Sequence, residues 1–202
     1  MGQLLMAGVG PTSSAGAAAD VDRRTLLACK AHDPAAFRTF VLAYQRAVFA
    51  LVSRVLGPGP HVQDLAQETF LRAYRAFPRF EIDAGARPST WLLTIAVRLA
   101  LNAKKRLSRS PPLSLVAAAR LADETTPEVE GARRELGRAI AVAAAELSDE
   151  QRAAFVLAQF HGLSVVEIAE ALDIPENTVK TRLFRARAHL RAKLAHFEKG
   201  RL

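Results

Sequence analysis

The 202-residue sequence predicts an all-α protein of two small helical domains joined by a flexible linker, the second of which carries a helix-turn-helix. Half of the residues are hydrophobic, which is enough for real cores, and alanine is abundant while alternating β-branched runs are few. A stretch rich in proline and serine interrupts the helical patterns in mid-chain. Near the C-terminus, only a tight turn separates two helical patterns. These observations together predict the fold class.

The N-terminal part begins with residues 1–20, which are mostly small and lack a basic n-region, so we expect a flexible tail rather than a secretory signal. After a short helix, Asp33 and Pro34 predict an N-cap and the first position of a long helix. The glycines and prolines of 57–60 end that helix. The next helix is expected over about 61–76.

Residues 78–88 contain Gly85 and two prolines and are expected to form a loop. Ser89 is predicted to cap the helix that follows, which extends to about Leu107. Between positions 84 and 110 the chain has six basic residues and no acid. This part of the chain is therefore a strongly cationic segment.

Residues 108–127 contain three prolines and clusters of serine and threonine, a composition typical of a linker. We therefore place an N-terminal domain at 21–107 and a C-terminal domain at 128–202. In the second domain, Ser148 and Gln151 match a capping box that opens a helix ending near Phe160. We expect His161, at the end of that helix, to be a cation that suits the helix dipole.

The predicted helix-turn-helix follows directly. Ser164 is placed to cap a short helix, the pattern breaks at Asp173 and Ile174, and Pro175 suits the first position of a second helix. The apolar stripe of the second helix leaves most of its lysines and arginines on the other faces. One side of this helix is expected to pack and the other to be cationic.

Positive charge is concentrated in this last segment. From position 178 to the C-terminus there are eight Lys/Arg against one acid, in a chain of formal net charge +8 and a sequence pI near 10.4. Nucleic acid is the favoured partner, ahead of an anionic membrane surface. The alternative is a helical hairpin whose basic face contacts only solvent.

No catalytic constellation is visible: the five histidines are scattered, and no HxxxH motif or paired carboxylates mark a metal site. We therefore expect no enzyme activity, no cofactor and no metal. Cys29 is the only cysteine, which excludes an internal disulfide. No apolar run approaches the roughly 18 residues of a membrane span, so we expect no membrane insertion and a cytoplasmic protein.

Three blocks of the sequence carry a family resemblance. They are DLAQETFLRAYRAFPRF (64–80), STWLLTIAVRLALNAKKR (89–106) and GLSVVEIAEALDIPENTVKTRLFRAR (162–187). In this order they resemble the signature blocks of the extracytoplasmic-function sigma factors, over roughly residues 33–194. The resemblance implies an alternative sigma factor. Its N-terminal domain would bind the clamp helices of the largest subunit of RNA polymerase and melt the downstream promoter element, and its helix-turn-helix would bind the upstream element.

The resemblance also implies functional residues. A polymerase-binding face matches Asp64, Gln67 and Glu68. Contacts to the downstream element match basic residues in and before the second block: Arg87, Arg98, Lys104, Lys105 and Arg106. Contacts to the upstream element match the start of the last helix, with Arg182 and Arg187 expected on phosphates: Thr178, Lys180, Thr181, Arg182, Phe184, Arg185 and Arg187. Trp91 is interpreted as a core residue rather than a base-stacking one. An anti-sigma factor is implied as a further partner.

The sequence departs from the family pattern at two places. Arg98 stands where an asparagine is common, in the helix that helps to capture a flipped promoter base. Ala86-Arg87-Pro88 stands where an aromatic residue is usual. We expect the promoter preference to differ from that of relatives. Two rival classes remain: a stand-alone helix-turn-helix regulator with a ligand-binding or dimerising N-terminal domain, and a DNA-processing enzyme, which the missing catalytic cluster disfavours.

Overall fold

The computed structural model describes residues 21–83, 87–107 and 127–199. Within these ranges every regular element is a helix, as predicted for an all-α protein. The predicted N-terminal tail and all but the last residue of the predicted linker lie outside the described residues. The division of the chain into domains therefore stays a prediction.

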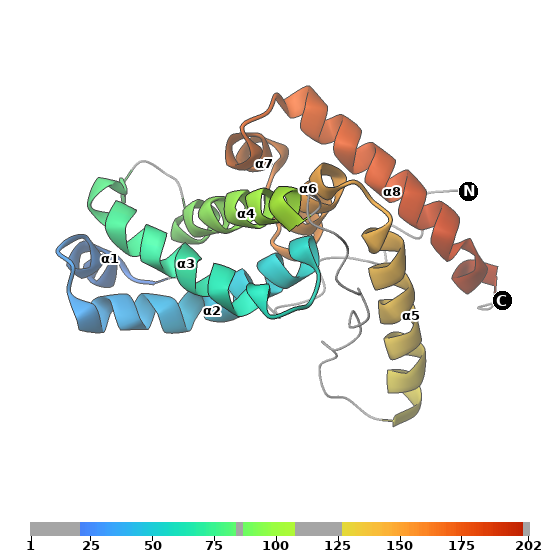
Figure 1. Ribbon diagram of the computed structural model, residues 1–202, viewed down its shortest axis with the longest axis horizontal. Coiled ribbons are helices and arrows are strands. Elements are labelled where there is room, and N and C mark those ends of the chain that lie inside the picture. The colour runs from blue at the N-terminus through green and yellow to red at the C-terminus, as the bar shows by residue number, and fades with distance from the viewer. Residues whose placement is uncertain (1–20, 84–86, 108–126, 200–202) are drawn as a thin grey trace.

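The N-terminal helices form one bundle (Figure 1). Its elements are α1 (Arg23–Lys30), α2 (Pro34–Leu56), α3 (His61–Ala76), a short 3-10 helix η1 (Phe77–Arg79) and α4 (Pro88–Leu107). Helices α3 and α4 both pack against α2, the longest of the set. We call these elements the N-terminal unit.

The C-terminal helices are α5 (Pro127–Ala145), α6 (Asp149–Phe160), α7 (Val165–Leu172) and α8 (Glu176–Lys199). Helix α8 packs against α5, α6 and α7, and its C-terminal half extends beside α5 (Figure 1). We call these elements the C-terminal unit.

Side-chain caps fix several helix starts where the sequence predicts them. The Asp33 carboxylate accepts a hydrogen bond of 2.8 Å from the Ala36 N–H, at the start of α2. Ser148 forms the predicted capping box with Gln151. Ser164 caps α7 and forms a capping box with Glu167. These caps satisfy backbone N–H groups that have no partner within their own helix.

Two expectations are wrong. Helix α4 begins at Pro88, and the Trp91 N–H donates to the Arg87 carbonyl at 3.1 Å, so Ser89 lies inside the first turn and does not cap it. Proline suits this first position because its missing N–H would have had no helical partner. His161 is largely buried, and burial, together with the neighbouring Arg54, lowers its pKa to about 4, so it is neutral at pH 7. Desolvation outweighs the helix dipole there.

Aromatic rings fill the centre of the N-terminal unit. Phe40 and Phe77 are fully buried, with ring centroids 5.0 Å apart in an edge-to-face pair. Trp91 packs against Phe77 and Phe80, with centroids 5.2 and 4.8 Å away. Trp91 thus packs, partly buried, against the core, in agreement with its interpretation as a packing residue.

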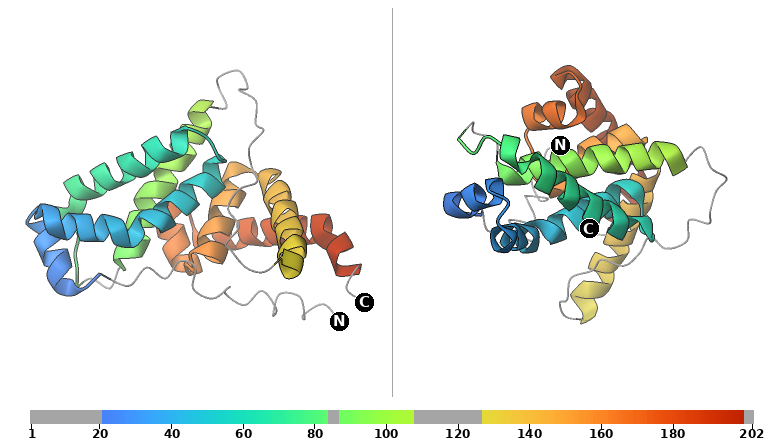
Figure 2. Two further views of the ribbon diagram at one scale, coloured as in Figure 1. Left: turned by 90° about the horizontal axis from the view of Figure 1, so that it is seen from below. Right: turned by 60° about the vertical axis from the view of Figure 1, so that its left-hand side comes forward.

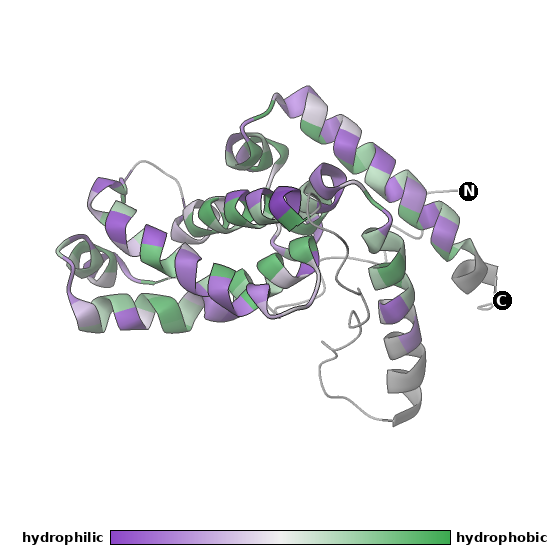
Figure 3. Cartoon of the chain, viewed as in Figure 1, coloured by the Kyte–Doolittle hydropathy of each residue, from purple (hydrophilic) through white to green (hydrophobic). Residues whose placement is uncertain are grey.

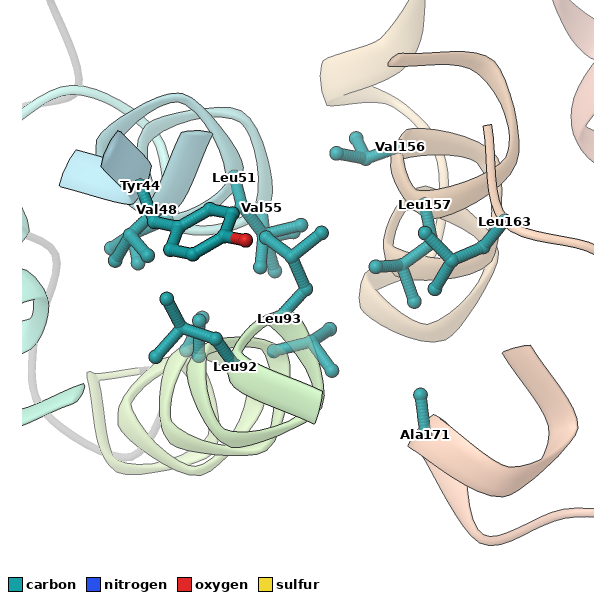
Figure 4. Packing of buried hydrophobic residues seen from close by; sticks show 14 of the residues in the cluster. Tyr44, Val48, Leu51, Val55, Leu92, Leu93, Val156, Leu157, Leu163 and Ala171 are labelled. Carbon is teal, nitrogen blue, oxygen red and sulfur yellow. The ribbon is translucent and has the colours of Figure 1, made fainter. Parts of the chain in front are cut away.

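The two units share one hydrophobic core. Figure 4 shows buried side chains of α2 and α4, among them Val55 and Leu93, facing Leu157 of α6, Leu163 and Ala171 of the C-terminal unit. These residues belong to one continuous cluster of buried side chains. In Figure 2 the C-terminal helices lie directly against the N-terminal bundle. The units thus form one compact body.

Helix α2 is long and apolar enough to cross a membrane by length and composition alone. It packs against α1, α3, α4 and α6, and seven of its residues are buried, including Tyr44 and Leu51. A core helix of this kind passes the same composition test, so α2 is weak evidence for a membrane span.

Candidate nucleic-acid interface

A tight turn joins α7 to α8. Asp173 ends α7 in the left-handed conformation, with φ 55°, which aspartate tolerates better than most residues. The Pro175 carbonyl accepts the first hydrogen bonds of α8, from the N–H groups of Thr178 and Val179. Pro175 therefore lies directly before α8, which begins at Glu176, and the prediction of Pro175 at the first helical position is wrong by one residue. The chain therefore reverses between two helices within a few residues, the arrangement of a helix-turn-helix.

Helix α8 has a buried face and a cationic face. Its buried residues recur every three or four positions: Val179, Leu183, Ala186 and Leu190. Figure 3 shows both hydrophobic and hydrophilic residues along α8. Packing against α5, α6 and α7 thus leaves the charged face of α8 directed toward solvent.

The predicted upstream-element residues lie together on the first half of α8. Lys180, Arg185 and Arg187 are exposed, and Phe184, at 73%, is the most exposed large hydrophobic residue among the described side chains. Thr178 and Arg182 are half-buried. The Thr181 hydroxyl donates to the Asn177 carbonyl at 2.8 Å, which leaves its oxygen free to accept from a ligand.

One ion pair lies within this surface. Lys180 Nζ is 3.7 Å from a carboxylate oxygen of Glu176, one turn earlier on α8. Both side chains are at least half exposed, so the pair contributes little to stability and a phosphate or base edge can replace the carboxylate. The surface therefore combines cations, a hydroxyl and one exposed aromatic ring, which are the groups that contact phosphates and base edges.

The predicted polymerase-binding face lies on α3. Asp64 and Gln67 are exposed, and Glu68 is half-buried and pairs with Arg72 at 2.7 Å. The buried residues of α3, including Val62 and Ala66, lie on its other side. The three side chains thus form an acidic and amide edge that the core does not use.

The five predicted downstream-element residues fall into two groups. Lys104, Lys105 and Arg106 occupy the last turn of α4, where Lys104 Nζ lies 3.4 Å from the Leu56 carbonyl oxygen. Arg87 and Arg98 lie instead where α4 meets α7, and both contact α7. The structure therefore does not bring the five residues together on one surface.

The contacts between α4 and α7 involve residues that the sequence analysis does not single out. Arg98 Nε donates to the Ala171 carbonyl, and an Arg98 terminal nitrogen donates to the Glu170 carbonyl, each at 2.8 Å. Glu167 accepts from the Thr90 hydroxyl at 3.0 Å and from Arg87 at 3.4 Å. The partners are more than 70 positions apart in sequence, so no local pattern signals them.

Among the described residues no group of three or more His, Cys, Asp or Glu side chains could hold a metal ion. Cys29 is buried, and desolvation raises the pKa of its thiol to about 11, so it is a packing residue rather than a nucleophile.

A helical bundle followed by a helix-turn-helix with a basic second helix is typical of DNA-binding proteins. Two family models match the chain: Sigma-70 region 2 over residues 40–110, and Sigma-70, region 4 over residues 137–190. The chain belongs to the extracytoplasmic-function sigma factors. It is thus an alternative sigma factor that directs transcription initiation, and the stand-alone regulator is not favoured.

Curated relatives support this assignment. The chain is 35% identical over 164 residues to the RNA polymerase sigma-H factor of Pseudomonas aeruginosa, across 77% of this chain and 84% of the relative. It is 37% identical over 164 residues to the ECF RNA polymerase sigma-E factor of Escherichia coli K12, with the same coverage.

Solved structures share the fold. CnrH, in complex with the cytosolic domain of CnrY, superposes with a TM-score of 0.62 at 27% identity, over 88% of this chain and 99% of that one. The sigma factor RpoE of Bartonella quintana, in complex with the anti-sigma factor NepR, superposes with a TM-score of 0.63 at 24% identity, over 79% of this chain and 96% of that one.

Proposed function

We propose that this sigma factor binds the clamp helices of the largest polymerase subunit through Asp64, Gln67 and Glu68 of α3. The exposure of Asp64 and Gln67, and their separation from the buried face of α3, support this assignment. An acidic edge complements a basic partner helix and suppresses binding to acidic ones. Glu68 would exchange its pairing with Arg72 for the partner's cations.

Helix α8 is the proposed recognition helix for the upstream promoter element. The observation that carries this proposal is the exposed stripe of Lys180, Thr181, Phe184 and Arg185 on the first half of α8. Lysine and arginine donate to guanine acceptors in the major groove, and an exposed apolar ring contacts a thymine methyl group. Arg182 and Arg187 flank the stripe and would contact phosphates.

The end of α4 is the proposed contact to the downstream element. Lys104, Lys105 and Arg106 give three consecutive cations at the last turn, two of them exposed. Cations along a helix end follow the phosphates of an opened strand. Arg87 and Arg98 would join this surface only when they leave α7.

An anti-sigma factor is a proposed partner, and the cytoplasm is the proposed compartment. CnrH and RpoE, which share the fold, were each solved with a bound partner, the cytosolic domain of CnrY and the anti-sigma factor NepR. A protein of net charge +8 with exposed cationic surfaces binds bulk DNA unless the surfaces are covered. Sigma factors are non-enzymatic regulators, so the chemistry belongs to the polymerase.

Charge reversal on α3 tests the docking proposal. We expect the double variant Asp64→Lys, Glu68→Lys to lose binding to core polymerase by at least about tenfold, because each lysine faces a basic partner. Loss of the exposed Glu68–Arg72 pair should cost stability only slightly. The measurement is a fluorescence titration of the labelled full-length protein with purified core polymerase.

A matched control reverses two exposed carboxylates elsewhere, Glu81→Lys and Glu135→Lys, which changes the net charge by the same amount. The control should bind core polymerase as the wild type does. If both variants lose binding to core polymerase equally, net charge and not the position of the carboxylates determines the affinity. Normal binding by the α3 variant would show that this face is not the docking site.

A further inference from the structure

Arg98 caps a helix of the other unit. Its guanidinium donates two hydrogen bonds of 2.8 Å to the carbonyls of Glu170 and Ala171, in the last turn of α7. The last carbonyls of a helix have no partner within it and carry the negative end of the helix dipole. A cation with two donors in a fixed fork is well suited to that position. The Glu170 carbonyl also accepts from the Asp173 N–H at 3.3 Å, so Arg98 adds a cation from a distant part of the chain to the C-terminal cap of α7.

The other end of α7 is also held by α4. Glu167, in the first turn of α7, accepts from the Thr90 hydroxyl and pairs with Arg87. Thr90 and Arg98 are eight residues apart, which is about 12 Å along α4, and α7 itself is eight residues long. The α7 partners, Glu167 and the carbonyls of Glu170 and Ala171, are only three to four residues apart, so α4 contacts α7 near both of its ends through two separate polar contacts.

Apolar side chains fill the space between these two polar contacts. Ile168 and Ala171 of α7 and Val97 of α4 are fully buried, and all belong to the shared core. Apolar contacts alone do not select one register, whereas a fork donor on two particular carbonyls does. The polar contacts thus fix how the units sit against each other.

These contacts occupy two residues that the proposed function assigns to the downstream element. The donors of Arg98 that face α7 cannot contact a phosphate or base at the same time. Arg87 faces the same competition with Glu167. In the closed arrangement α7 engages Arg87 and Arg98, and the other residues proposed for the downstream element lie at the end of α4.

We propose that Arg98 holds the free protein in a closed, inactive arrangement by capping α7, and that docking on polymerase and the opened promoter strand must release it. Both hydrogen bonds come from the guanidinium of this one residue, so the proposed device depends on an arginine at position 98. The link to promoter contacts rests on the proposed function; the closed arrangement itself does not.

Distance measurements on the free full-length protein test the closure. Exposed alanines on the two units, Ala35 on α2 and Ala188 on α8, are replaced by cysteine and labelled with a donor and an acceptor dye. Cys29 is buried, with a thiol pKa raised to about 11, and should label slowly. Arg98→Met retains the apolar stem of the side chain and removes both hydrogen bonds.

We expect Arg98→Met to raise the population with long dye separation about three- to tenfold over the wild type. Arg98→Lys should give a smaller rise, since one ammonium cannot fork between two carbonyls. The control Arg38→Met removes an exposed arginine of α2 and should leave the distances unchanged. Unchanged distances in Arg98→Met, or an equal change in Arg38→Met, would overturn the proposal.

A second variant protects the test against misfolding. Thr90→Val removes the hydroxyl that contacts Glu167 with little change of shape, and far-UV circular dichroism checks that each variant keeps its helices. If Arg98→Met loses its helices, Thr90→Val decides the question: a rise in the open population supports the closure, and no rise refutes it.

A last arm separates this inference from the proposed function. Adding core polymerase and a promoter with an opened strand should shift the wild type to the open population. If Arg98 closes the free protein but polymerase and promoter do not open it, the contacts between Arg98 and α7 stand. That result would refute both the proposed release and the proposed role of Arg98 at the downstream element.

Discussion

Arg152 offers a direct test of how the units are joined. This side chain is only 8% exposed, and its guanidinium donates to four backbone carbonyls. Three lie at the end of α5 and in the turn before α6: Ala144 at 3.0 Å, Ala145 at 2.7 Å and Leu147 at 3.1 Å. The fourth is the Val55 carbonyl of α2, at 3.3 Å. One buried cation thus joins a helix end, a turn and the N-terminal unit.

Replacing Arg152 by methionine fills much of the volume and removes every donor. Four carbonyls then lose a charged partner. At the same time the free-energy cost of burying the guanidinium disappears, a burial that lowers the pKa of Arg152 in the wild type. Bonds to charged groups contribute about 1.5–3 kcal/mol each before this offset, and carbonyls near the surface recover water. We expect a net loss of about 2–4 kcal/mol in the free energy of unfolding.

Urea unfolding followed by circular dichroism measures this loss. With a slope of about 2 kcal/mol per molar urea, the midpoint should fall by about 1–2 M at an unchanged slope. Arg138→Met on α5, an exposed arginine, is the control and should change stability by no more than about 0.5 kcal/mol. A loss below about 1 kcal/mol for Arg152→Met would mean that water replaces the guanidinium and that the four contacts do not join the units.

Three further predictions concern other parts of the chain. The pKa of His161 falls from 6.5 to about 4 on folding, so between these pH values the unfolded chain binds a proton that the folded chain does not. The free energy of unfolding should therefore fall as the pH drops from about 6.5 to 4, by about 2 kcal/mol at pH 5. In urea unfolding at several pH values, His161→Leu should remove this pH dependence. Lys180→Ala or Arg185→Ala should lower the binding free energy by about 1–3 kcal/mol on the cognate upstream site only, whereas Arg187→Ala should weaken binding to all DNA sequences equally. If all three variants lose as much binding to scrambled DNA as to the cognate site, α8 contacts phosphates only. In limited proteolysis with trypsin, the first cuts should fall within 108–127, and first cuts inside either helical unit would contradict the linker prediction.

Helix starts were predictable where a cap lies next to the helix it stabilises. Asp33, Ser148 and Ser164 each accept from an N–H three residues later, so the pattern and the contact occupy the same short stretch. Ser89 shows the limit of that reasoning, because Pro88 can itself begin a helix, which places the serine two positions after the N-cap. The helix-turn-helix was predictable for the same reason, since its turn and both apolar stripes are local.

Contacts between the units were not predictable from sequence. Arg98 is a cation in a basic segment, so its sequence context predicts a DNA contact. Its two carbonyl partners lie on α7, which only the tertiary fold brings close to it. In the sequence, His161 resembles a helix-end cation, but in the fold burial and the charge of Arg54 lower its pKa. In each case the chemistry of the side chain is set by a residue at least 70 positions away, or by burial, and neither leaves a periodic signal.

Because the two units share one hydrophobic core, separating them costs free energy. Cutting the chain at the linker would expose Leu157, Leu163 and Ile168, which the N-terminal unit helps to bury, so separation costs apolar contact as well as the polar contacts of α7. A partner opens such a protein only by as much as it binds the open arrangement more tightly than the closed one. Under the proposed function, polymerase would supply that difference because it would engage α3 and the promoter contacts of both units at once, as a bivalent site does. DNA alone would meet the closed arrangement, with the two proposed cationic surfaces in one fixed geometry, and would gain no such advantage.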